Sequence, residues 1–81
     1  MPLFYVDIDD GERLSTDEIG TEFDDLHAAR DAALATLAEV AAHILPSTEQ
    51  RRISVTVFDD ARQQLFQARM VVVEAWTGKT S

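Results

Sequence analysis

Carboxylates crowd around Gly11 near the start of the chain, and oxygen ligands at such a density can bind calcium. An EF-hand loop carries its glycine at the sixth position, which would place Val6 and Ile8 at the first and third positions, where oxygen ligands are required. The segment therefore fails as a calcium loop. We interpret Asp10-Gly11 as a type I′ hairpin turn instead, because both central residues of that turn need positive φ.

Histidine is another common metal ligand, and the chain has His27 and His43. They lie about 24 Å apart along one predicted helix at 1.5 Å per residue, so they cannot share a metal ion. Glu39 lies one turn from His43, and we interpret that pair as a contact on the helix surface. The sequence has no cysteine, so it offers no thiolate ligand, thiol nucleophile or disulfide. We predict no metal and no cofactor.

Hydroxyl side chains lie in predicted turns, strand surfaces and the tail, and none stands beside a base and an orienting acid. Gly11, Gly20 and Gly78 do not have the spacing of a phosphate-binding loop. Arg51-Arg52 is too short a basic patch to bind nucleic acid on a chain with a net charge of −8. We expect no enzyme, no nucleic-acid partner and no small-molecule ligand, and we rank a small metal-dependent enzyme last among the alternatives.

The negative charge is concentrated in the first 31 residues, where ten acids stand against two arginines. The remaining residues carry five acids and five bases. A solvated acidic face explains such a block, and attraction to a basic protein partner is the functional alternative. The same charge repels nucleic acid and anionic membranes. The candidate acidic patch consists of Asp9, Asp10, Glu12, Asp17 and Glu18.

One long helix is predicted from Asp24 to Leu45. Asp24 or Asp25 can cap its first free N–H groups, and Pro46 ends it because proline has no N–H to continue the helix. Eight alanines keep its side-chain layer thin, so the helix can approach a sheet closely. Apolar residues recur at alternating steps of three and four, the period of a helical stripe. They are Leu26, Ala29, Ala33, Leu37, Val40 and Ile44.

Alternation of apolar and polar residues predicts four strands. They run from Leu3 to Asp9, from Glu12 to Ser15, from Arg52 to the Asp59-Asp60 turn, and from Leu65 to about Ala75. The loop over residues 16–23 is expected to be ordered by Ile19 and Phe23 beneath the helix start. The predicted fold is α+β with the order β-β-α-β-β, a four-stranded, mostly antiparallel sheet with the long helix on one face. The strand order stays open, since the first strand can pair with the third or the fourth.

We predict a single α+β domain over residues 1–76, followed by a polar, frayed tail over residues 77–81. A polar connector is expected over residues 47–51. No apolar run reaches the length of a membrane span, and the N-terminus carries carboxylates where a signal peptide needs positive charge. We therefore expect a cytoplasmic protein with no membrane partner.

The face of the sheet that the helix does not cover keeps apolar side chains by strand parity. Sheet curvature, the loop before the helix, and Trp76 or the tail would shield them in one interpretation; in the other they form a homodimer or partner surface. Val71 and Val73 make the fourth strand apolar on both sides, as in strands covered on both faces, so we place them near the centre of a homodimer. The candidate interface consists of Leu3, Tyr5, Phe58, Leu65, Val71 and Val73.

Three motifs run through most of the chain. They are Phe4-x-Val6-x-Ile8-x-Asp10-Gly11, Asp17-Glu18-x-Gly20-x-Glu22-Phe23-x-x-Leu26-x-x-Ala29 and Phe66-x-Ala68-x-Met70-x-Val72. Through them the chain resembles a family of small uncharacterised bacterial proteins, known as a domain of unknown function. These are framework residues, so the resemblance implies no active-site residue. The opening strand, turn and helix also resemble the HicB-type antitoxin domain, whose proteins usually append a DNA-binding segment that we do not expect here.

Together these observations predict a small protein-interaction or regulatory module that acts as a homodimer. The alternative is an antitoxin-like or inhibitor domain that offers its acidic N-terminal half to a basic partner.

Overall fold

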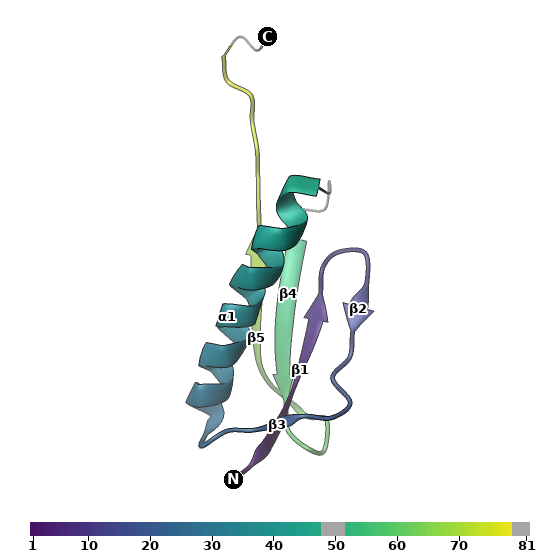
Figure 1. Ribbon diagram of the computed structural model, residues 1–81, viewed down its shortest axis with the longest axis vertical. Coiled ribbons are helices and arrows are strands. Elements are labelled where there is room, and N and C mark those ends of the chain that lie inside the picture. The colour runs from purple at the N-terminus through teal and green to yellow at the C-terminus, as the bar shows by residue number, and fades with distance from the viewer. Residues whose placement is uncertain (48–51, 79–81) are drawn as a thin grey trace.

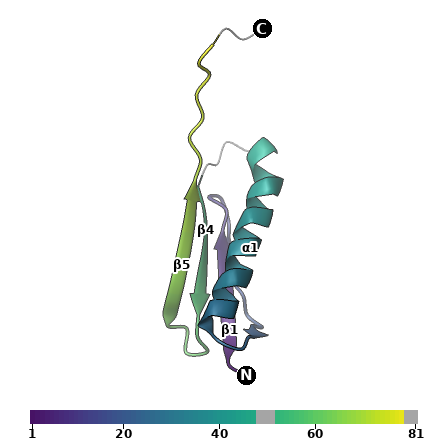
Figure 2. The ribbon, with the colours of Figure 1, turned by 90° about the vertical axis from the view of Figure 1, so that its left-hand side faces the viewer.

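The chain folds into two layers, one helix packed on one face of an antiparallel sheet (Figure 1, Figure 2). A computed structural model describes residues 1–47 and 52–78. The predicted α+β class and the order β-β-α-β-β are confirmed, with one additional short strand before the helix. The elements are β1 (Leu3–Asp9), β2 (Leu14–Ser15), β3 (Thr21–Glu22), α1 (Leu26–Ile44), the 3₁₀ helix η1 (Leu45–Ser47), β4 (Arg52–Phe58) and β5 (Gln64–Val71).

The sheet has the order β2-β1-β4-β5, and β3 pairs with the first residues of β1. All pairings are antiparallel, and β1 lies beside β4, so the first predicted strand pairs with the third. β4 takes a central place because Ile53, Val55 and Val57 on its inner face are β-branched residues that are fully buried beneath α1. The register places Val6 opposite Val57 and continues to Phe66 on β5.

α1 begins one residue after Asp25, whose carboxylate caps the helix by accepting a hydrogen bond from the N–H of Ala28 at 2.9 Å. It ends at Ile44, and the chain turns through η1 at Pro46. The buried face of α1 follows the predicted stripe with two differences. Ala41, which is not part of that stripe, is buried, and Leu26, which is part of it, is exposed. No helix in the described part of the chain combines the length and the hydropathy that a membrane-spanning helix requires.

The first hairpin differs from its prediction by one residue. The N–H of Asp10 donates to the carbonyl of Arg13 at 3.1 Å, which makes Gly11 and Glu12 the central residues of the turn. Gly11 has a φ of 95°, but Asp10 does not have positive φ, so the type I′ assignment is wrong. The carboxylate of Asp10 accepts from the N–H groups of Glu12 and Arg13, and this side-chain cap stabilises the alternative turn.

The loop before the helix contains β3, which the sequence did not predict. Phe23 packs beside Phe4 with ring centroids 6.1 Å apart, as its predicted role as an anchor requires. Ile19 is 85% exposed, so its predicted role as a second anchor is wrong. Backbone N–H groups that donate to the carboxylate of Asp17 hold this loop in place of an apolar contact.

β5 ends at Val71, four residues before the predicted end at Ala75, because β4 begins at Arg52, which is the partner of Val71. Among residues 1–47 and 52–78, no strand lies beside the residues beyond Val71, and the chain continues past the end of the sheet (Figure 1). Most of the predicted connector (48–51 of 47–51) and most of the predicted tail (79–81 of 77–81) lie outside the described residues.

The close approach of α1 to the sheet generates the first prediction. Ala33 is buried against the core, whereas Ala35 on the same helix is exposed. Ala33→Leu inserts three carbon atoms into a filled space, so we expect it to lower the free energy of unfolding by about 1–3 kcal/mol in urea titration. Ala35→Leu is the matched control and should change it by no more than about 0.5 kcal/mol. Equal effects of the two variants would contradict a thin, close-packed helix layer.

Candidate functional site

The helix-free face is the side of the sheet opposite α1, and its side chains lie in rows across the strands. The register places Tyr5 opposite Phe58 in one row and Asp7 opposite Thr56 in the next. The following rows carry Asp9, Ser54 and Arg69, and then Arg52 and Val71. This face therefore changes from aromatic near the start of β1 to polar and basic near its end.

Asp7 is buried in the row next to the aromatic end of this face, and the residue is 7% exposed. One carboxylate oxygen accepts a hydrogen bond from the Nη2 group of Arg62 at 2.6 Å. The other accepts from the backbone N–H of Asp17 at 3.0 Å. Both oxygens of the buried acid are thus bonded, and its charge is balanced by the arginine.

Arg62 reaches this position from the turn between β4 and β5, where it has a φ of 61°. Its guanidinium carbon lies 4.2 Å from the ring centroid of Phe58 and 5.7 Å from that of Tyr5. Its Nη1 group also donates to the carbonyl of Asp17 at 3.4 Å. Arg62 therefore covers the aromatic end of the helix-free face and connects β1, the loop before α1, and the β4–β5 turn.

Asp17 organises the loop before α1. Its carboxylate accepts hydrogen bonds from the N–H groups of Val6 at 3.1 Å, Ile19 at 3.1 Å and Gly20 at 2.9 Å. Burial alone raises the pKa of this carboxyl, but the three N–H groups and the charge of Arg62 outweigh burial, so the pKa lies below its usual value of 3.8.

Gly20 brings the same loop against the apolar side chains of β1. Its φ is 80°, and a Cβ atom at this position would lie 3.0 Å from the ring of Tyr5 and 3.1 Å from the side chain of Leu3. Only glycine fits both the backbone conformation and the space. The loop thus shields one end of the helix-free face, as one of the two interpretations of the sequence held.

The six residues of the candidate interface are not brought together. Leu3, Tyr5 and Phe58 are half-buried beneath the loop and Arg62. Leu65 is the residue left without a partner at the bulge in β5, and the valines lie at and beyond the other end of that strand. Val71 is 57% exposed, and Val73 and Trp76 are both 88% exposed. Trp76 does not shield the face, contrary to one expectation.

Three acids of the candidate acidic patch bond to backbone groups. Asp9 accepts from the N–H of Gly11, and Asp17 holds the loop before α1. The N–H groups of Glu12 and Arg13 lower the pKa of Asp10. Among the described residues, no three His, Cys, Asp or Glu side chains are close enough together to hold a metal ion. The three aspartates of the patch therefore cap turns and loops. Within the described chain, the side chains of the other two patch residues, Glu12 and Glu18, accept no hydrogen bond from a backbone N–H group.

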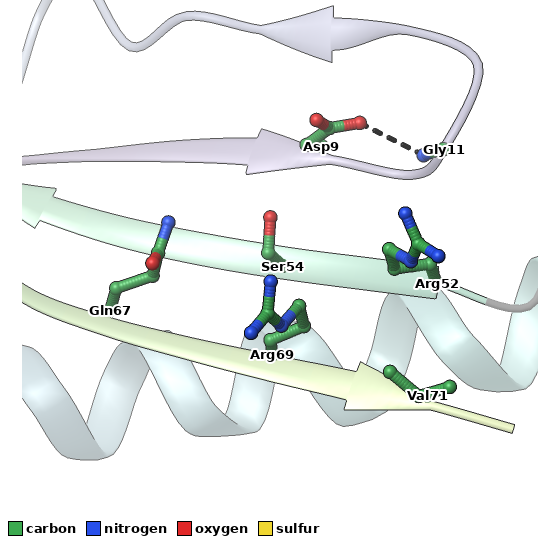
Figure 3. A pocket seen from close by; sticks show the side chains of 7 residues that line it. All are labelled: Asp9, Gly11, Arg52, Ser54, Gln67, Arg69 and Val71. Atoms are coloured by element: carbon green, nitrogen blue, oxygen red, sulfur yellow. Dashed lines mark hydrogen bonds between the residues drawn. The ribbon is translucent and has the colours of Figure 1, made fainter.

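A cavity of about 530 Å³ opens at the other end of the helix-free face (Figure 3). The side chains that line it rise from β1, β4 and β5 on the side away from α1 (Figure 3). Its lining residues are Asp9, Gly11, Arg52, Ser54, Gln67, Arg69 and Val71.

Sequence reasoning did not identify Asp7, Arg62 or this cavity. The sequence signal that could have identified Asp7 is an aspartate between apolar residues of a strand, but its partner Arg62 lies 55 residues away. The two arginines that line the cavity, Arg52 and Arg69, lie on different strands, so the sequence could indicate the cavity only once the strand register was known.

The fold and this face define a small two-layer α+β domain. One helix covers one face of its sheet, and the loop before α1 covers part of the other face together with the ion pair of Arg62 and Asp7, which we call the arginine clamp. The chain belongs to the family described as a domain of unknown function, DUF6894, whose model matches residues 3–71. This confirms the resemblance to a family of uncharacterised proteins. No curated protein and no solved structure gives a significant match. The likeness to the HicB-type antitoxin domain finds no support in these comparisons.

The lowered pKa of Asp17 generates a prediction about acid unfolding. Because the folded-state pKa lies below the usual value of 3.8, the ionised carboxylate stabilises the fold above that pH. This stability is lost as the pH falls through the folded-state pKa. Asp17→Asn removes the charge and one acceptor, so we expect its free energy of unfolding at pH 7 to fall by about 1 kcal/mol or more.

Urea titration across the acid range measures this effect. The difference between wild type and Asp17→Asn should narrow as the pH falls below 3.8. Glu18→Gln removes an exposed neighbouring carboxylate and is the matched control, which should leave stability nearly unchanged at every pH. A difference that stays constant down to the lowest pH would show that the charge of Asp17 does not stabilise the loop.

Proposed function

We propose that this protein is a non-catalytic protein-interaction module that acts as a homodimer, and that two copies pair along β5 and the residues that follow it. The single observation that carries the proposal is the asymmetry between the two edges of the sheet. One edge is closed by the chain itself, and the other presents a long strand with apolar residues.

The edge at β1 is closed in three places. β2 pairs with Ile8 and Asp9, and β3 pairs with Leu3 and Phe4. Between them the N–H of Val6 is bonded to the carboxylate of Asp17. Two-residue strands and a side-chain cap are devices that prevent edge-to-edge association.

In the part of the chain that the structure describes, the edge at β5 has none of these features. β5 is eight residues long, and β4 is the one strand that pairs with it among the described residues. Unpaired N–H and C=O groups on such a strand are a template for pairing with another strand. β5 of a second copy is a suitable partner strand, because it has the same length and the same open edge.

The arm, defined here as residues 72–77, supports a second copy as the occupant. It continues past the end of the sheet in line with β5 (Figure 1, Figure 2). Val73 and Trp76 on the arm are almost fully exposed, and large apolar side chains rarely remain so without a partner. The arm supplies strand-forming residues, and β5 supplies an edge that lacks a strand.

Antiparallel pairing about a two-fold axis perpendicular to the sheet keeps both helices on one side. Opposite residues then share a face, and a register with Val71 opposite its own copy lays each arm along the partner's β5. In that register Trp76 lies opposite Phe66, and Val73 lies opposite Arg69. Burial of the two valines in both copies contributes roughly 4–6 kcal/mol before the entropy cost of association is subtracted.

No observation favours the alternative of a domain that binds a basic partner through the acidic patch. Asp10 and Asp17 in that patch accept backbone hydrogen bonds, so their charges already have structural partners.

The register is tested by Val71→Cys. Opposite residues in an antiparallel pair have Cα atoms about 4.5–5.5 Å apart, within the range that a disulfide spans. We expect mild oxidation at tens of micromolar protein to link two Val71→Cys chains, seen on a non-reducing gel. Leu14→Cys places an exposed thiol on the other edge and is the matched control, which should remain unlinked.

Light scattering of the unmodified protein provides an independent readout. We expect a mass of twice the chain mass of 9.0 kDa at the same concentration. A monomeric wild type, or equal linking of Val71→Cys and Leu14→Cys, would exclude this homodimer and leave a different protein as the occupant of the edge.

A further inference from the structure

We propose that the cavity at the end of the helix-free face is a binding site for a small organic molecule, held through an oxyanion group such as a carboxylate or a phosphate. The sequence alone predicted no small-molecule ligand. The cavity lies within one chain, so this inference does not rest on the proposed homodimer.

Two arginines carry the argument. Arg52 lies opposite Val71 and Arg69 lies opposite Ser54, so the arginines occupy diagonal positions on adjacent strands. Diagonal neighbours on one face have Cα atoms about 7–8 Å apart, within reach of two long side chains that converge on one group. Both side chains line the cavity.

Neither Arg52 nor Arg69 forms an ion pair or donates a hydrogen bond within the described residues. This contrasts with Arg62, whose guanidinium group is bonded to Asp7 and stacked on Phe58. Guanidinium groups present a planar fork of donors that matches the two oxygens of a carboxylate or a phosphate. Two unpaired forks on a chain of net charge −8 form a local positive site that an anion would neutralise.

The other lining groups limit how a ligand can lie. Ser54 provides a hydroxyl group in the row of Arg69, and the amide nitrogen of Gln67 is held by the hydroxyl of Thr56 at 3.2 Å, which leaves the amide oxygen as an acceptor. Asp9 accepts a hydrogen bond from Gly11 through one oxygen and places its charge on the β1 side of the cavity. Asp9 repels a second anionic group there and accepts hydrogen bonds from hydroxyl or amino groups.

The size of the cavity selects against a bare inorganic ion as the full ligand. Pockets for small organic ligands have volumes of about 300–1,000 Å³, and this cavity of about 530 Å³ falls in that range. The ligand class that fits has an oxyanion at one end and hydrogen-bond donors at the other.

The test is a titration of the ¹⁵N-labelled full chain with inorganic phosphate and, separately, with citrate, at constant ionic strength and followed by NMR. We expect saturable shifts of backbone N–H signals at Gly11, Ser54 and Arg69 for at least one anion. Arg52→Gln and Arg69→Gln should each weaken that binding about tenfold or more, since each removes charged hydrogen bonds. The spectra also show whether each variant is folded.

Arg30→Gln on α1 is the matched control, because it makes the same change of charge outside the cavity, and it should bind as the wild type does. Saturation with phosphate alone identifies a phosphate-bearing ligand, and saturation with citrate alone identifies a carboxylate-bearing ligand. The inference is overturned if neither anion saturates the shifts at millimolar concentration, or if all three variants bind equally well.

Discussion

The sheet has two faces and the chain provides one helix, and this constraint governs the helix-free face. At one end of that face the chain supplies its own cover. Asp7 is buried there with its charge balanced by Arg62, whose guanidinium group stacks on Phe58 while the loop before α1 lies against Tyr5. The arginine clamp takes the place of a second apolar layer, and it connects segments that are far apart in the sequence.

Asp17 links this cover to the edge of the sheet, because its carboxylate bonds both to the loop and to the N–H of Val6 on β1. One residue thereby orders the loop and helps to close the edge beside β2 and β3. Within the described residues, the edge of β5 and the far end of the helix-free face are left uncovered by this loop and by α1. Self-association along β5 and anion binding beside Arg52 and Arg69 are proposals about these two remaining surfaces.

Periodicity predicted most of the fold, because burial of one face leaves a direct trace in the order of apolar residues. β1 and β4 have the predicted starts, and α1 differs by one or two residues at each end. The clamp was not predictable in this way, since the pairing of Asp7 with Arg62 depends on strand register and on a turn with positive φ. The prediction that Ile19 anchors the loop before α1 was wrong for the same reason. Hydrogen bonds to the carboxylate of Asp17 order that loop, and they leave no apolar pattern in the sequence.

The central claim is that the edge of β5 is the surface left for a second copy. Amide hydrogen exchange, measured residue by residue at low and high protein concentration, tests it most directly. We expect the N–H groups of β5 that point away from β4, and those of residues 72–77, to become protected as the concentration rises. The N–H groups bonded to β4 should be protected at every concentration. Rapid exchange of the outer N–H groups at every concentration would contradict it.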